Sequence, residues 1–283
     1  MIDIVLTIND ISVEKFLHNG WIPKTYRGKP LSVVDQAVFF IRSIQKNWTM
    51  PRDIYVMHSL PMPRESWDRL NEAGATVLPR QHGLEGFAAV ENRFTAYQDS
   101  YRTDATHRLI LDADMIALKD PGLSLDYDIQ AGLAGYCVLD REDWQYICGV
   151  CGVEMPSGKI MKPPSSPWRE YARGGTGFFP CYNAGAVLVE TNLAHSIIQD
   201  IADYMREIRA SKLSPNMRGP FAYTIALSLA MAASGASKAI FPAGFNFIGT
   251  MLSPANYAGD VSLYHYLGSE RPELSELYGD YFG

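Results

Sequence analysis

The sequence predicts an α/β fold built on a largely parallel sheet covered by helices. Two observations lead to this prediction. Short apolar runs of strand length alternate with segments of helical periodicity through the first half of the chain. The length of 283 residues and the hydrophobic content of 47% are sufficient for one large core or two modest ones. Alternating strands and helices are typical of β-α-β units with right-handed crossovers, which produce parallel sheets.

The elements of the first half follow from the apolar pattern and its boundary residues. Ser32 is a good N-cap, and Asp35 completes a capping pattern at the start of the first helix. Gly74 is expected to end the second helix. In order, we expect strands over 3–8, 53–58, 75–78 and 108–112, and helices over 32–47, 63–73 and 86–100.

The second half is less regular. Gly, Pro and Ser are frequent over 148–181, which we interpret as a long loop. We expect strands over 130–139 and 183–189, helices over 192–210 and about 221–234, and a last extended segment over 261–268. The sequence has no internal repeat and no linker that separates two domains, so we expect one domain with an inserted loop.

Charge and cysteine usage exclude several classes of function. The net charge is -6 and no run of Lys or Arg exceeds two residues, which argues against a nucleic-acid partner. The N-terminus lacks the features of a signal peptide, and no apolar segment approaches the roughly 20 residues of a membrane helix. Four cysteines are too few for a disulfide scaffold, so we expect a cytoplasmic protein. Cys148 and Cys151 form a C-x-x-C pair without a second pair for zinc, and we interpret them as loop or core thiols.

Two carboxylates end the apolar run of RLILDADMIALKDP, residues 108–121. Asp112 and Asp114 fall at the carboxyl end of a predicted strand, where parallel sheets bind ligands. Residues two apart in an extended segment point the same way, and close carboxylates repel unless a cation lies beside them. Mg²⁺ or Mn²⁺ meets that need. The alternative is a solvated strand end with capping acids.

Five segments in order carry a family resemblance: LTIND from Leu6, NRFTAY from Asn92, LILDADMIAL from Leu109, YNAGAVLVE from Tyr182 and YHYLGSERP from Tyr264. This set resembles the metal-dependent nucleotide-sugar glycosyltransferases of the GT-A fold, particularly glycogenin and related bacterial galactosyltransferases. The resemblance implies one Rossmann-like domain over 1–283, with a mixed, mostly parallel sheet and helices on both faces. Residues 1–120 would form the nucleotide-binding half, and 121–283 the acceptor and sugar half with the 148–181 loop.

The resemblance also implies roles for individual residues. Asp112, Asp114 and His265 would bind Mn²⁺ or Mg²⁺. Asp140 and Arg93 would be catalytic, although Glu142 and Asp143 compete with Asp140. Together with the metal ligands, the residues expected to contact the donor are Leu6, Thr7, Asn9, Arg93, Ala113, Asn183, Gly185, Gly268 and Arg271.

The expected function is metal-dependent transfer of a sugar from a nucleoside-diphosphate sugar, a UDP-sugar in our interpretation, to an acceptor hydroxyl. One departure matters: relatives usually carry an Asp-Gln or Asp-Glu pair at the start of the helix near residue 220, and this chain has no acid between Glu207 and Asp260. A non-catalytic nucleotide-sugar-binding protein therefore remains an alternative. A phosphatase of the haloacid-dehalogenase type is a third, disfavoured because Met115 and Ile116 follow the acids in mid-chain. The sequence carries no indication of the oligomeric state.

Overall fold

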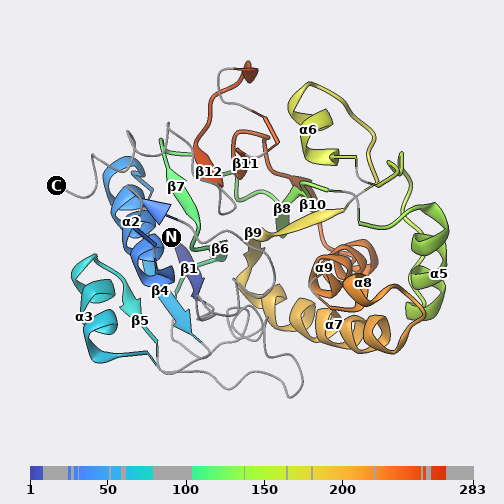
Figure 1. Cartoon of the computed structure of the whole chain (residues 1–283), viewed down its shortest axis with the longest axis horizontal. Coiled ribbons are helices and arrows are strands. Elements are labelled where there is room, and N and C mark those ends of the chain that lie inside the picture. Colours follow the sequence, from blue (N-terminus) through green and yellow to red (C-terminus); the bar gives the residue numbers. More distant parts are fainter. Residues whose placement is uncertain are drawn as a thin grey trace.

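The fold is built on a seven-stranded sheet with the strand order β10-β8-β9-β6-β1-β4-β5 (Figure 1). The computed structural model describes residues 1–8, 25–26, 29–30, 32–50, 52–58, 62–78, 104–136, 138–163, 165–179, 181–219, 221–249, 251–252 and 256–265. The strands of the large sheet are β1 (Ile2–Ile8), β4 (Arg52–His58), β5 (Thr76–Val77), β6 (His107–Asp112), β8 (Ile129–Leu133), β9 (Tyr182–Glu190) and β10 (Lys238–Ile240).

The sheet is mixed but mostly parallel, which confirms the predicted fold class. β1 pairs in parallel with β4 and β6, β4 with β5, and β10 with β8. Among the described strands of this sheet, only β9 runs antiparallel to its neighbours, β6 and β8. Every residue of β1 is buried, as expected for a strand covered on both faces.

Helices cover both faces of this sheet. α2 (Val33–Asn47) and α3 (Arg64–Glu72) lie on one side, and α5 (Arg141–Cys151), α7 (Thr191–Ala210) and α9 (Ala222–Ala233) lie on the other (Figure 1). Alternate residues of β1 enter different cores: Ile4 and Leu6 pack with α2, whereas Val5 packs with the layer of α7 and α9. None of the described helices is long and apolar enough to cross a membrane.

The start of α2 matches the sequence prediction. The backbone N–H of Asp35 donates to Ser32 Oγ over 3.0 Å, and the backbone N–H of Ser32 donates to the Asp35 carboxylate over 2.9 Å. Arg69 of α3 also donates to Asp35, over 2.6 Å. The capping box therefore fixes both the start of α2 and its contact with α3.

A second, three-stranded sheet was not predicted, apart from the extended segment that contains its middle strand. It consists of β7 (Met115–Ala117), β11 (Phe247–Ile248) and β12 (Leu263–His265), in the order β11-β12-β7. β7 and β12 are antiparallel. Ser43 of α2 anchors β7, since its hydroxyl accepts a hydrogen bond from the Ala117 N–H over 2.9 Å. A two-stranded sheet of β2 (Thr25–Tyr26) and β3 (Lys29–Pro30) completes the described strands.

Two expectations for the second half were wrong. β8 ends at Leu133 instead of 139, because the next backbone groups leave the sheet: the Ala134 N–H donates to Cys181 O, and its carbonyl accepts from Trp168. The expected loop over 148–181 contains the end of α5 and all of α6 (Pro167–Ala172). The remaining short helix is α8 (Pro215–Arg218). The helix expected over 86–100 lies outside the described residues.

Candidate metal centre

The two aspartates stand where the large sheet passes into the small one. Asp112 is the last residue of β6, and its register partner on the parallel strand β1 is Thr7. Asp114 directly precedes β7. Both side chains are partly buried. The acids therefore lie at the carboxyl edge of β1 and β6, as the sequence predicted, and the turn between β6 and β7 brings them to one site.

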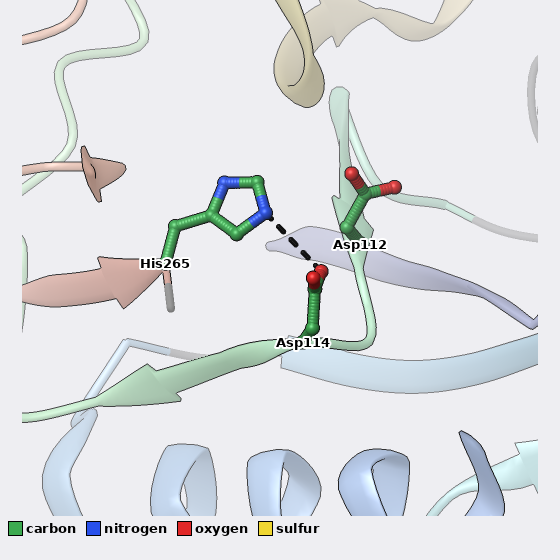
Figure 2. Close-up of side chains that lie close together, drawn as sticks. All are labelled: Asp112, Asp114 and His265. Atoms are coloured by element: carbon green, nitrogen blue, oxygen red, sulfur yellow. Dashed lines mark hydrogen bonds and ion pairs between the residues drawn. The ribbon is translucent and has the colours of Figure 1, made fainter. Parts of the chain in front are cut away.

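His265 reaches the same site from the far end of the sequence. The antiparallel pairing of β12 with β7 places His265 opposite Met115, next to Asp114. Its imidazole is 1% exposed, and Nε2 lies 3.1 Å from Asp114 Oδ1 (Figure 2). The pairing of two short strands thus joins residues 151 positions apart.

These three side chains fit a divalent cation. One ligand atom from each lies within 4.8 Å of the others. An octahedral cation with ligands at about 2.1 Å would set neighbouring ligand atoms about 3.0 Å apart and opposite ones about 4.2 Å apart. The 3.1 Å separation of His265 Nε2 and Asp114 Oδ1 matches neighbouring ligands. Two carboxylates and one imidazole suit Mn²⁺ or Mg²⁺, and the imidazole favours Mn²⁺.

Gly185 of β9 lets the backbone approach this centre. A Cβ atom at this position would lie 2.6 Å from Asp112 Oδ2 and 2.9 Å from His265 Cε1. Any other residue would therefore push against two of the three candidate ligands. Asn183, two residues earlier, turns its Oδ1 toward the strand and accepts a hydrogen bond from the Gly185 N–H over 2.6 Å. This bond lies beside a shift in the register of β9 against β8, between Ala131 and Gly132.

Asn246 supports His265 from behind, and the sequence reading missed it. Its Oδ1 lies 2.9 Å from His265 Nδ1, and the residue is fully buried. Its backbone φ is 62°, a left-handed conformation that Asn tolerates better than most residues. The available signal was a single amide residue inside the apolar segment FPAGFNFIG, because a buried polar side chain needs a partner.

Similarity to known proteins is found at the level of structure and not of sequence. Protein-family profiles give no match to the sequence, and neither do curated proteins. The galactosyltransferase LgtC, solved with donor and acceptor sugar analogues, superimposes with a TM-score of 0.55 at 12% identity, covering 99% of this chain and 94% of LgtC. Mouse xyloside xylosyltransferase 1 gives 0.54 at 11% identity, covering 95% and 100%. GlyE from Streptococcus pneumoniae TIGR4 gives 0.54 at 14% identity, covering 99% of this chain and 59% of GlyE.

The chain has the GT-A glycosyltransferase fold. The predicted resemblance is therefore confirmed at the level of the fold, over nearly the full chain. At 11–14% identity the likeness does not extend to the donor, the acceptor or the roles of individual residues.

The remaining predicted site residues that the structure describes differ in their burial and in their contacts. Leu6 is fully buried in the core with α2, so its side chain serves packing and only its backbone is left for a donor contact. Ala113, between the two acids, also belongs to that core. Thr7 is buried beside Asp112. The carboxylate of Asp140 accepts a hydrogen bond from the Asp143 N–H over 2.9 Å and caps α5.

Asp140 therefore has a structural role that the sequence reading did not assign to it, and its predicted catalytic role stays a prediction. Asn9, Arg93, Gly268 and Arg271 lie outside the described residues, and their roles also stay predictions.

The C-x-x-C pair is placed within α5 rather than in a loop. Cys148 is buried in the core. Burial raises the pKa of Cys148, and burial together with the neighbouring Glu207 raises that of Cys151 to about 12. Both effects disfavour the reactive thiolate. The structure agrees with the expectation of thiols that serve packing.

Proposed function

We propose that this chain is a metal-dependent glycosyltransferase that moves a sugar from a nucleoside-diphosphate sugar, specifically a UDP-sugar, to an acceptor hydroxyl. The observation that supports the proposal is the cluster of Asp112, Asp114 and His265 at the carboxyl edge of the sheet in a GT-A fold. LgtC, solved with donor and acceptor sugar analogues, shares that fold.

The proposed roles of the described residues follow from the geometry of the centre, and those of Arg93, Gly268 and Arg271 follow from the family resemblance. Asp112, Asp114 and His265 would hold Mn²⁺ or Mg²⁺, which when bound would stabilise negative charge on the leaving diphosphate. Gly185 would keep the β9 backbone clear of those ligands. Arg271 would neutralise the diphosphate by paired hydrogen bonds, Gly268 would admit it to the backbone, and Arg93 would hold the donor.

A second candidate function rests on α9. This helix has no acidic residue in its first turn, in agreement with the sequence, which lacks the Asp-Gln or Asp-Glu pair that relatives usually carry near residue 220. A chain without that pair could bind the donor and transfer little or no sugar. The two candidates share the metal centre and differ in turnover, so binding and turnover must be measured separately.

Binding is tested by thermal unfolding with UDP, GDP, ADP or CMP, each with Mn²⁺, Mg²⁺ or EDTA. A ligand at about 100 times its Kd adds roughly 2.7 kcal/mol of stability, which shifts Tm by several degrees in a domain of this size. We expect a shift with UDP that needs the cation and is lost in Asp114→Asn. Asp203→Asn, which removes one exposed carboxylate from α7, is the matched control and should keep the shift. No shift with any nucleotide would remove the basis of the proposal.

Turnover is tested by release of UDP from UDP-sugars, with and without candidate carbohydrate acceptors. UDP release that depends on Mn²⁺ and on an intact Asp114 supports the glycosyltransferase. Metal-dependent binding without release from any sugar donor would favour the non-catalytic candidate.

A further inference from the structure

The bond between Asn246 and His265 has a chemical consequence for the metal centre. A neutral imidazole carries one N–H and one nitrogen with a free lone pair, and a metal binds the lone pair. His265 Nε2 faces Asp114 (Figure 2). On the other side of the ring, Nδ1 faces Asn246 Oδ1 at 2.9 Å. An acceptor at Nδ1 fixes the proton there and leaves Nε2 for the cation.

We propose that Asn246 is a positioning residue for the metal centre: it holds His265 as the Nδ1–H tautomer, with the Nε2 lone pair directed at the cation. This inference rests on the proposed metal-dependent function and adds the residue that prepares one of its ligands. Asn246 lies directly before β11, which pairs with β12, so the backbone fixes both partners of the bond.

An amide suits this position because its oxygen accepts hydrogen bonds and its nitrogen donates them. Without a cation, Nε2 at 3.1 Å from the Asp114 carboxylate is best placed as a donor, and Nδ1 then becomes an acceptor. Asn246 Nδ2 is buried and has no hydrogen-bond partner in the part of the chain that the structure describes. Rotation of the amide by half a turn would present this donor to Nδ1. Gly132 leaves the space beside Nδ2, since a Cβ there would lie 3.0 Å away. Asn246 can thus keep a bond to His265 when no cation is bound, and its Oδ1, 2.9 Å from Nδ1, would hold the Nδ1–H tautomer when Nε2 serves as a ligand.

A competing explanation is that Asn246 serves only its backbone. Its φ of 62° favours Asn, Asp or Gly over other residues. The two explanations separate in Asn246→Gly, which keeps the left-handed backbone and removes the amide, and in Asn246→Asp, which keeps both the backbone and an acceptor for Nδ1.

The experiment titrates Mn²⁺ into wild type and both variants, with free Mn²⁺ followed by its electron paramagnetic resonance. Removal of a group that orients a metal ligand costs about 10- to 100-fold in metal affinity, and we expect that loss for Asn246→Gly. Asn246→Asp should stay within a few-fold of wild type. Thermal unfolding without metal checks that each variant is folded. If folded Asn246→Gly binds Mn²⁺ as tightly as wild type, the proposal is overturned and only the backbone role remains.

A second readout does not depend on the Asn246 variants. Long-range ¹H–¹⁵N correlation spectra of the imidazoles, recorded with diamagnetic Mg²⁺, report which nitrogen carries the proton. The signal of His265 among the six histidines is assigned through its loss in His265→Gln. We expect a protonated Nδ1 and an unprotonated Nε2 in the wild type with Mg²⁺. A protonated Nε2 in the metal-bound wild type would refute the role of Asn246. Failure of the wild type to bind Mn²⁺ or Mg²⁺ would instead refute the metal centre itself, and with it this inference.

Discussion

Gly185→Ala tests the closest backbone approach in the metal centre. Ordinary contacts to a Cβ begin at about 3.4 Å, whereas the Cβ added by this substitution would lie 2.6 Å from Asp112 Oδ2, so the carboxylate must retreat by roughly 0.8 Å. Metal–ligand distances are fixed to within about 0.2 Å, so this displacement is several times the tolerance of the site. We expect Mn²⁺ to bind about 10- to 100-fold more weakly. The closest atom that must move ends the partly buried side chain of Asp112, so the fold should survive with a loss of about 1–3 kcal/mol.

The assay compares the Mn²⁺ affinity and the free energy of unfolding of Gly185→Ala with those of wild type and Gly149→Ala. Gly149 lies in α5, and a Cβ there meets no atom within 4 Å. Gly149→Ala should bind Mn²⁺ like wild type and gain up to about 1 kcal/mol from helix propensity. If Gly185→Ala folds and binds Mn²⁺ with wild-type affinity, then the close approach of residue 185 to Asp112 does not limit cation binding, and the prediction is wrong.

Three further predictions concern the framework around the site. Ser43→Ala leaves the buried Ala117 N–H without its acceptor, so urea unfolding should show a loss of about 1–3 kcal/mol. Asp35→Ala should cost about 1 kcal/mol at neutral pH, from the lost helix cap and the bond to Arg69. Burial raises the pKa of Asp35, but the hydrogen bonds from Arg69 and the cap lower it more, so the folded pKa lies below 3.8. Its contribution is therefore present above that pH and lost as the pH falls through the folded pKa, and the difference between Asp35→Ala and wild type should shrink in acid unfolding curves. Finally, with its pKa raised to about 12 by burial, Cys151 should react with iodoacetamide at pH 8 far more slowly in the native protein than in denaturant, as followed by peptide mass spectrometry.

Local sequence patterns were sufficient to predict the positions of most strands in the large sheet. Buried parallel strands read as continuous apolar runs, which is why β1, β4 and β6 were predicted to within a residue or two at each end. The capping residues Ser32 and Asp35 placed the start of α2 correctly. The start of α6 carried a similar signal, with Ser166 as N-cap and Pro167 in the first turn, but it was obscured by the surrounding Gly and Pro residues.

Pairings between distant segments were beyond the reach of local patterns. β7, β11 and β12 have two or three residues each, too few to show a period. Asp112 and Asp114 could be inferred from their place after a strand, whereas His265 was selected by family resemblance alone. Asn246 has a role only because β11 pairs with β12, and no spacing in the sequence indicates that pairing.

The pairing of β7 with β12 makes the candidate metal centre depend on a long-range contact of the fold. The candidate ligands Asp114 and His265 are separated by 151 positions, so the chain must close a long loop before a cation would have its full set of donors. Contacts at such separation form slowly compared with local ones. A cation that binds only the completed set would stabilise the pairing of β12 with β7, because its binding energy would add to the stability of the folded state. If the proposed centre binds a cation, its affinity would therefore also report how completely β12 has paired with β7.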